Sequence, residues 1–267
     1  MSLPISFLSD FGSRDEFVGV VHGVIERISP GTRVIDVTHD VPRGNLRAGS
    51  LALLRAIQYL PDGVVLAVVD PGVGTGRRAI AASTARGYFV GPDNGLLAPA
   101  VAMVGGAQRF VALESPEFRL PGAGSTFDGR DLFAPAAAVL ASGEAGLDDL
   151  GPEVDPSSVV PLLLPLTESA GGKVSGEVWW VDGYGNAQTN VAPEDLEGLG
   201  IHPGDDVMVR VGAVEHTMHW VTGYGTGEGP VIHCDSHGLI AIAIPGGDAA
   251  ASLGIREGLS VGFRSPS

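Results

Sequence analysis

The stretch Val64-Val65-Leu66-Ala67-Val68-Val69-Asp70-Pro71-Gly72-Val73-Gly74-Thr75-Gly76-Arg77-Arg78 decides the fold of the first half of this chain. A continuous apolar run of this kind is typical of a strand buried on both faces of a parallel sheet. Ligands of open α/β folds bind outside the carboxyl ends of such strands. We therefore expect Asp70 and Arg77 to lie at a ligand site, although Asp-Pro-Gly is also an ordinary turn and Arg77-Arg78 also fits a solvated pair.

The glycines after Asp70 do not form either of two common nucleotide-binding motifs. Their spacing, Gly72-x-Gly74-x-Gly76, lacks the dinucleotide fingerprint, and no Lys-Ser/Thr follows as in a Walker loop. The small apolar run at 79–83 predicts a second strand instead of a phosphate-binding helix.

Strand-like and helix-like periods alternate from the start of the chain to about residue 150. Ser13-x-x-Glu16 is typical of a capping box before an amphipathic helix, and Asn45 is suited to cap a second helix that ends near Tyr59. This alternation predicts an α/β N-terminal domain with a mainly parallel sheet over residues 1–151. The predicted strands and helices are 5–9, 17–28, 33–37, 45–59, 64–69, 79–83, 88–90, 96–104, 109–113 and 131–141.

The second half of the chain has a different pattern. Residues 152–172 carry four prolines and end in Ala170-Gly171-Gly172, which predicts an extended linker. Residues 173–267 form short apolar segments separated by glycine-rich turns, which predicts a small antiparallel β-barrel-like C-terminal domain. The expected strands are 174–181, 206–211, 216–221, 230–233 and 239–244.

Composition narrows the possible partners. The chain has 267 residues, 44% of them hydrophobic, and a formal net charge of -15, which disfavours nucleic acid and anionic membrane surfaces. The N-terminus does not resemble a signal peptide and no run reaches membrane-spanning length, so we expect a cytoplasmic protein with a small-molecule substrate. Cys234 is the only cysteine, which excludes an internal disulfide; its apolar neighbours predict a buried core position.

Further carboxylates follow other predicted strands. Asp10 is placed where a carboxylate can accept both hydroxyls of a ribose, or else caps a turn. His39 is interpreted as a hydrogen-bonded structural histidine. Asp131 is expected to cap a helix, Arg130 is either an ion-pair partner or part of the site, and Asp128 has no evident structural role.

Taken together, these motifs resemble those of the S-adenosyl-L-methionine hydroxide adenosyltransferases, the adenosine-forming hydrolases related to the fluorinase and the chlorinase. The resemblance extends in the same order from about residue 5 to residue 260. Its motifs in this chain are Phe7-Leu8-Ser9-Asp10-Phe11-Gly12, Asp36-Val37-Thr38-His39, Val69-Asp70-Pro71-Gly72-Val73-Gly74-Thr75, Gly91-Pro92-Asp93-Asn94-Gly95-Leu96-Leu97, Thr126-Phe127 with Gly129-Arg130-Asp131, Asp182 with Gly185-Asn186, Thr189-Asn190, and Ser236 with Gly238-Leu239.

The resemblance implies a reaction and an assembly. Water or hydroxide attacks C5′ of the ribose of S-adenosyl-L-methionine, and methionine leaves to give adenosine. The sulfonium is already a good leaving group, so neither a metal nor another cofactor is required. The resemblance also implies a homotrimer with active sites between the N-terminal domain of one subunit and the C-terminal domain of its neighbour.

The resemblance also assigns roles to individual residues. Asp70 and Arg77 would orient and activate the water. The implied substrate-binding residues are Asp10 at the ribose hydroxyls, Val73 and Phe127 near the sugar, Asp182 and Ser236 at the methionine, and Tyr184, Asn186, Ile244 and Gly246 around the adenine.

Asp128 departs from the pattern of the family, whose hydrolases usually carry Thr-Phe-His-Gly-Arg-Asp. A carboxylate in place of that histidine adds negative charge near the nucleophile, which should repel halide more than water. We expect hydrolysis to survive, with Asp128 as a base or a water-orienting group. His237 stands where the halogenases have an arginine, so the contact with the methionine carboxylate would be weaker or pH-dependent.

Other functions remain open at this point. Loss of the histidine fits a non-catalytic protein that binds S-adenosyl-L-methionine or adenosine. Carboxylates after neighbouring strands also fit a metal-dependent hydrolase built on Asp10, Asp70, Asp93, Asp128 and Asp131. A halogenase is disfavoured, because halogenases carry a Tyr-Pro-Ala-Thr-like sequence where this chain has Asp70-Pro71-Gly72-Val73.

Overall fold

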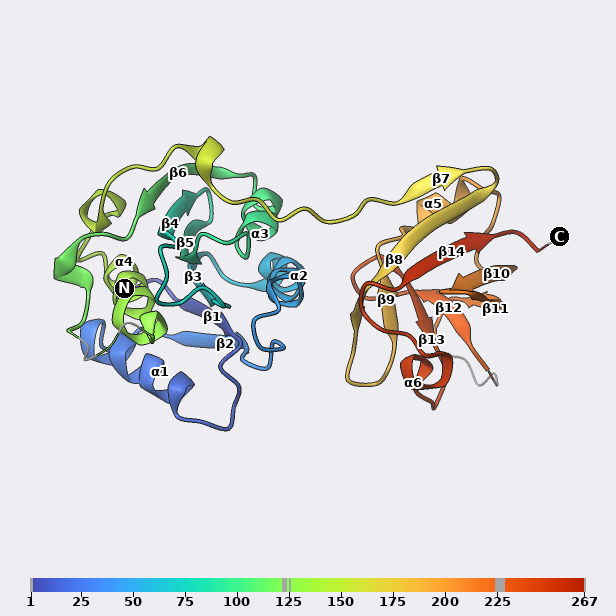
Figure 1. Ribbon diagram of the computed structural model, residues 1–267, viewed down its shortest axis with the longest axis horizontal. Coiled ribbons are helices and arrows are strands. Elements are labelled where there is room, and N and C mark those ends of the chain that lie inside the picture. Colours follow the sequence, from blue (N-terminus) through green and yellow to red (C-terminus); the bar gives the residue numbers. More distant parts are fainter. Residues whose placement is uncertain (1, 122–123, 125, 224–228, 267) are drawn as a thin grey trace. The chain divides into compact units, whose positions relative to one another are not determined.

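The computed structural model of the protein describes residues 2–121, 124, 126–223 and 229–266. The chain forms two compact units, Met1–Leu162 and Leu163–Ser267 (Figure 1). No helix among the described residues has the length and apolar character needed to cross a membrane. The main elements of the first unit are β1 (Ile5–Ser9), α1 (Phe17–Ile28), β2 (Val34–Thr38), α2 (Leu46–Ala56), β3 (Gly63–Val68), β4 (Ala79–Thr84), β5 (Gly87–Pro92), α3 (Ala98–Met103), β6 (Ala107–Ala112), a π-helical turn (Gly129–Phe133) and α4 (Ala134–Ser142).

The first unit is built on a six-stranded sheet with the order β2-β1-β3-β5-β4-β6. The pairs β1–β2, β1–β3 and β3–β5 are parallel, whereas β4 pairs antiparallel with both β5 and β6. The expected mainly parallel sheet is thus confirmed, with β4 as the reversed strand. From β1 the chain passes first to β2 on one side and then to β3 on the other, so the strand order reverses between β1 and β3.

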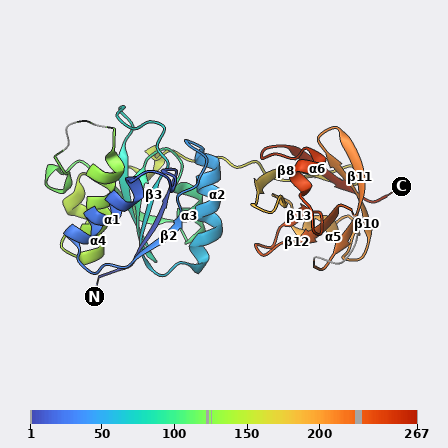
Figure 2. The same ribbon diagram turned by 90° about the horizontal axis from the view of Figure 1, so that it is seen from below.

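Both faces of this sheet are covered by helices, as Figure 2 shows. Along β3, Val64, Leu66 and Val68 face the core under α1 and α4, and the residues between them face the core under α2 and α3. Successive side chains of a strand point to opposite faces, so a strand with two buried faces must be apolar throughout. This explains the uninterrupted apolar run before Asp70.

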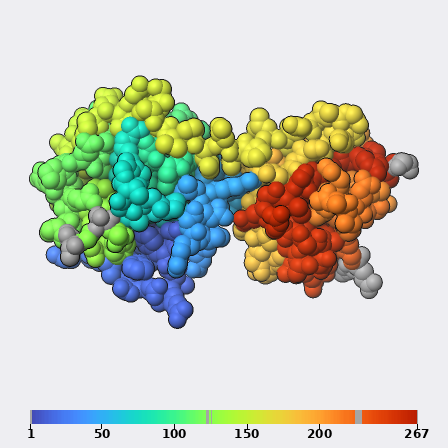
Figure 3. All heavy atoms as spheres, viewed as in Figure 1, coloured from blue at the N-terminus to red at the C-terminus, as the bar shows by residue number. Residues whose placement is uncertain are grey.

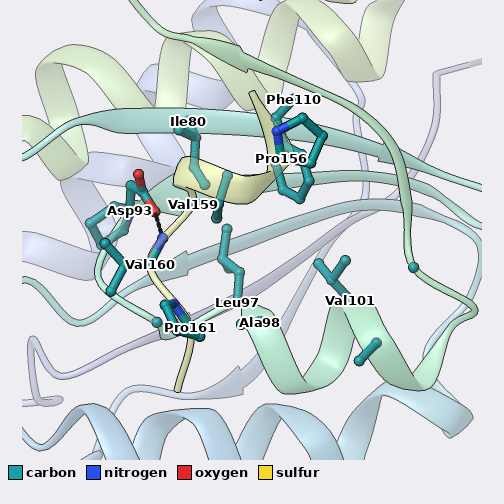
Figure 4. Close-up of a pocket in the computed structure, with 14 residues that line it drawn as sticks. Ile80, Asp93, Leu97, Ala98, Val101, Phe110, Pro156, Val159, Val160 and Pro161 are labelled. Carbon is teal, nitrogen blue, oxygen red and sulfur yellow. Dashed lines mark hydrogen bonds between the residues drawn. The ribbon is translucent and has the colours of Figure 1, made fainter. Parts of the chain in front are cut away.

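Residues 152–162 lie against the first unit and contribute to its surface (Figure 3). The backbone of Glu153 bridges to Val111 of β6. Further along, Pro156, Val159 and Pro161 line an apolar hollow of about 240 Å³ beside α3 (Figure 4). A 2.8 Å hydrogen bond from the Val160 amide to Asp93 holds this segment in place. Of the candidate site residues, only Asp93 is among the described residues that line this hollow.

The second unit is a closed seven-stranded barrel, which confirms the barrel-like expectation. The ring runs β14-β10-β11-β12-β13-β9-β8 and closes through β8–β14, with β7 added outside the ring on β8. All pairs are antiparallel except β11–β12. Its elements are β7 (Glu168–Ala170), β8 (Lys173–Val181), β9 (Ala187–Thr189), α5 (Pro193–Glu197), β10 (Asp206–Val211), β11 (Val214–Val221), β12 (Val231–Cys234), β13 (Ile240–Ala243), α6 (Ala249–Leu253) and β14 (Ser260–Arg264).

Of the two predicted helix caps, one is confirmed and one is wrong. Asn45 caps α2 as predicted, accepting a 3.0 Å hydrogen bond from the Ala48 amide. The capping box at Ser13 is wrong: α1 begins only at Phe17, its cap residue Glu16 makes no side-chain cap bond, and the Ser13 hydroxyl points to Asp40 at 3.5 Å.

Candidate active site

Asp10 and Asp70 both lie at the point where the strand order of the first sheet reverses. Asp10 follows β1 and Asp70 lies two residues after β3. The amide of Gly44 donates a 2.7 Å hydrogen bond to Asp10 Oδ2, and Gly44 also lies against the side chain of Pro71. The fold therefore connects the two loops at the place where open α/β sheets bind ligands.

The glycine-rich loop after Asp70 folds back so that Arg77 meets the carboxylate. The Val73 amide donates to the Asp70 carbonyl at 3.2 Å, and the Thr75 hydroxyl donates to the Gly72 carbonyl at 2.6 Å. Arg77 Nε then donates to Asp70 Oδ1 and Oδ2 at 3.0 and 2.8 Å, and Arg77 Nη2 also contacts Oδ2. The short turn thus produces a bidentate arginine–carboxylate pair, the geometry that a guanidinium favours.

Asp128 joins this pair from a distant part of the sequence. It immediately precedes the π-helical turn, and its Oδ2 accepts a 2.6 Å hydrogen bond from Arg77 Nη2. Its Oδ1 accepts a 2.7 Å bond from Arg119 Nη2. The structure brings together the three residues predicted to be catalytic and adds Arg119, so that two carboxylates and two guanidinium groups balance in formal charge.

Arg77 is held firmly between the two carboxylates. Burial alone would lower the pKa of Arg77, but its hydrogen bonds to Asp70 and Asp128 outweigh burial and raise that pKa above its usual value. The guanidinium also lies 5.2 Å from the centre of the Phe133 ring. Arg77 therefore stays a fixed positive charge at the site.

An aromatic wall stands beside this four-residue charge cluster. The Phe127 ring makes edge-on contacts with Phe11 and Phe17, at centroid distances of 5.7 and 5.1 Å. Glycine is favoured at position 129, because a Cβ there would lie 2.7 Å from the Phe11 ring and would force that ring to shift. The predicted residue Phe127 thus lies directly next to Asp128 as an apolar surface.

A polar cavity of about 470 Å³ opens beside the charge cluster. It is lined by Arg77, Arg119 and Asp128 and by residues Gly74–Gly76. Arg119 keeps 45% of its side chain exposed, so the cluster is accessible to solvent through this residue. The cavity is large enough for several waters.

The other acidic residues that the sequence pointed to are used in separate ion pairs. Arg78 Nε and Nη2 donate to Asp93 Oδ2 at 2.8 and 2.6 Å. Arg130 donates to both oxygens of Asp131 at 2.6 and 2.8 Å, so Arg130 is an ion-pair partner and the expected helix cap at Asp131 is wrong. Within the described parts of the chain, the five carboxylates of the metal-hydrolase alternative do not bring three ligand atoms together.

In the second unit, Asp182 organises a tight turn. Its Oδ1 accepts hydrogen bonds from the amides of Tyr184 and Asn186, and its Oδ2 accepts one from Asn186 Nδ2, each at 2.9 Å. Gly185 has φ +81°, and a Cβ there would clash with Asp248. The Tyr184 side chain is 82% exposed at the tip of this turn, so it is not a core residue.

Ser236 and His237 lie on a second turn, between β12 and β13. Asp235 Oδ1 accepts the His237 amide at 2.8 Å, and Gln188 Nε2 donates to Asp235 Oδ2. Cys234 lies beside them and is exposed, so the expected burial of this cysteine is wrong. The residue ends a strand at the rim of the barrel, where the alternation of buried side chains stops.

Two neighbouring hollows of the barrel collect the remaining predicted residues. One, of about 360 Å³, is lined by Asp182, Asn186, Ser236 and His237. The other, of about 690 Å³, is lined by Asp182, Tyr184, Asn186, Ile244 and Gly246. Because both hollows share Asp182 and Asn186, the barrel gathers all its predicted substrate-binding residues in one continuous region.

Both units of the chain match known proteins. Residues 5–151 match the family model of the S-adenosyl-L-methionine hydroxide adenosyltransferase N-terminal domain, and residues 176–262 match that of the C-terminal domain. A Salinispora tropica protein named (R)-S-adenosyl-L-methionine hydrolase is 46% identical over 254 residues, 95% of each chain. A Thermus thermophilus protein of the same name is 42% identical, over 97% of this chain and 98% of its own.

A more distant relative and a solved structure also match the chain over nearly its whole length. A fluorinase from Actinoplanes is 26% identical over 96% of both chains. The crystal structure of an uncharacterized conserved protein from Thermotoga maritima superimposes with a TM-score of 0.90 at 37% identity, over 97% of this chain and 99% of that one. The matched family models cover most of both units, and the chain belongs to the S-adenosyl-L-methionine hydroxide adenosyltransferase family.

Proposed function

We propose that this protein hydrolyses S-adenosyl-L-methionine to adenosine and L-methionine. The observation that carries the proposal is the Arg77 guanidinium held between Asp70 and Asp128 at the carboxyl edge of the sheet. The names of the relatives at 42–46% identity, (R)-S-adenosyl-L-methionine hydrolase, support this activity and point to the R configuration at the sulfonium sulfur.

The chemistry needs one well-placed water. Its oxygen forms a bond to ribose C5′ as the C5′–S bond breaks, the electron pair leaves with the methionine sulfur, and one proton is released. Because the sulfonium is a good leaving group, alignment of the water and exclusion of bulk solvent supply most of the rate. Arg77 favours the hydroxide-like character that develops on the attacking oxygen.

Asp128 is suited to orient the water. Both of its oxygens already accept hydrogen bonds from guanidinium groups, and each carboxylate oxygen has room for a further donor. Accepting a hydrogen bond from the water directs the lone pair of that water towards C5′. The proton then passes to solvent, which reaches the cluster past Arg119.

We also propose that the enzyme is a homotrimer whose sites join the first unit of one subunit to the second unit of its neighbour. The water-activating residues belong to the first unit and the predicted adenine and methionine contacts belong to the second. In the trimer, the first unit of each subunit would meet the second unit of a neighbouring subunit and so complete a site. Co-expression of an Asp70→Asn chain with an Asp182→Asn chain tests this, because mixed trimers would regain intact sites whereas each variant alone is inactive.

The direct test of the function uses the two sulfonium configurations separately. We expect purified protein to release adenosine and methionine in equal amounts from (R)-S-adenosyl-L-methionine, and Asp70→Asn to lose this activity. Calorimetric binding of either configuration without any adenosine would select the alternative of a non-catalytic binding protein, which the substitution of histidine by Asp128 suggests.

A further inference from the structure

Three potential metal ligands converge beside β2, apart from the charge cluster described above. His22 lies on α1, Asp36 on β2, and His39 just after β2. The Nε2 atoms of His22 and His39 lie 2.8 and 3.0 Å from the same oxygen, Asp36 Oδ1. The three ligand atoms lie within 4.8 Å of one another, and the described part of the chain contains no other such group of histidine, cysteine or acidic residues.

The spacing of these atoms is close to that of a zinc site. Tetrahedral Zn²⁺, with bonds of about 2.0–2.2 Å, places its ligand atoms about 3.3 Å apart. The two nitrogen–oxygen separations need to widen by only about 0.5 Å to reach this value. The side chains of His22 and Asp36 are 35% and 44% exposed, so a hydrated ion has access and can keep water as a fourth ligand.

His39 is arranged as a metal ligand usually is. Its side chain is nine-tenths buried, its Nδ1 lies 2.7 Å from Ser9 Oγ, and its ring packs edge-on against Phe7 at 4.5 Å. Such a partner on the second ring nitrogen fixes the orientation of the imidazole. Ser9 is itself fully buried, so the Ser9–His39–Asp36 series does not supply a nucleophile.

The other nitrogen of His39 is poorly satisfied within the protein. Although His39 Nε2 lies 3.0 Å from Asp36 Oδ1, it is buried and has no hydrogen-bond partner of acceptable geometry among the described residues. A buried nitrogen whose contact is poorly directed gains little from it, and native proteins seldom leave such a group without a better partner. A cation shared with Asp36 and His22 would satisfy this nitrogen.

Asp36 is suited to the same role. Burial would raise the pKa of Asp36, but the neighbouring His39 and His22 outweigh burial and hold that pKa below its usual value. Its Oδ1 atom, which both histidine Nε2 atoms already approach, is the third ligand atom of the group.

We propose that His22, Asp36 and His39 bind one zinc ion. The ion ties α1 to the end of β2, and through Ser9 it stiffens the loop that carries Asp10. The site is structural, and it does not depend on the proposed reaction.

Titration of metal-free protein with Zn²⁺ by calorimetry tests this inference. We expect one ion per chain, and at least about a 10-fold loss of affinity in His22→Ala and in Asp36→Asn. The matched control is His219→Ala, because His219 also pairs with an aspartate, at 3.1 Å, but lies outside any such group of three ligands in the described chain. This control should bind zinc like the unaltered protein.

Thermal unfolding provides the second readout. Zinc should raise the melting temperature of the unaltered protein and of His219→Ala, and should leave that of His22→Ala and Asp36→Asn unchanged. The inference is overturned if the unaltered protein binds no zinc, if both site variants bind it normally, or if binding is lost in Cys234→Ser and retained in His22→Ala, which would place the ion on the barrel.

Discussion

Replacing Arg77 by lysine keeps one positive charge but removes the planar fork that joins the two carboxylates. Arg77 donates through Nε to both oxygens of Asp70 and through Nη2 to Asp128. A lysine ammonium is a single point of charge and cannot reproduce the bidentate contact. Loss of about two hydrogen bonds to charged groups corresponds to about 3 kcal/mol, which is roughly a 100-fold fall in kcat/KM.

The assay is the initial rate of adenosine release, followed by chromatography over a range of substrate concentrations. Arg78→Lys is the matched control, because the adjacent Arg78 makes a similar pair with Asp93 but has no contact with Asp70 or Asp128 among the described bonds. We expect its kcat/KM to stay within about 3-fold of the unaltered enzyme. If Arg77→Lys keeps more than a third of the unaltered kcat/KM, the fork is not needed and the proposed role of Arg77 is wrong.

Three further changes test other parts of the structure. Arg119→Gln leaves Asp128 paired with Arg77 alone; because Arg119 is half exposed, we expect a loss of about 1 kcal/mol, seen as about a 5-fold lower kcat. Gly129→Ala places a Cβ 2.7 Å from the ring of Phe11, and should lower the free energy of unfolding by about 1–3 kcal/mol in urea titrations. The folded-state pKa of Asp36 is lowered, so its ionised form stabilises the protein above the ordinary value of 3.8, and this contribution is lost as the pH falls through the lower folded-state pKa. The difference in melting temperature between the unaltered protein and Asp36→Asn, measured without metal, should therefore shrink as the pH falls below about 3.8; a difference that grows there would contradict this account.

Where a single physical constraint acts on a whole segment, the sequence was sufficient to predict the structure. The run before Asp70 has apolar side chains at every position because both faces of β3 are buried, so its place inside a parallel sheet followed directly. The carboxyl edge of that strand then located Asp70, and the resemblance of the motifs located Arg77 and Asp128 in the same cluster.

Side-chain ion pairs could not be predicted from the local sequence. Arg119 lies in an irregular segment, and nothing in its local sequence indicates that the chain returns to place it 2.7 Å from Asp128. Asp131 was expected to cap a helix, but the helical turn already begins at Gly129, so Asp131 lies inside it and its carboxylate pairs with the adjacent Arg130.

In the barrel, three strands and the exposure of one residue could not be predicted from the local sequence. The strands β7, β9 and β14 were not predicted, because β7 and β9 are three residues long and β14 is defined by its long-range pairing with β10 and β8. Cys234 sits in an apolar stretch, and its exposure follows from its place at the end of β12 at the barrel rim, which the local pattern does not reveal.

Hydrolysis in water enriched in ¹⁸O tests the central claim most directly. If Asp70, Arg77 and Asp128 direct water to C5′, adenosine released from S-adenosyl-L-methionine will carry one ¹⁸O at its 5′ oxygen, the methionine will carry none, and Asp70→Asn will release neither above the spontaneous background. Adenosine without the label, label in the methionine product, or equal release by Asp70→Asn would contradict the account.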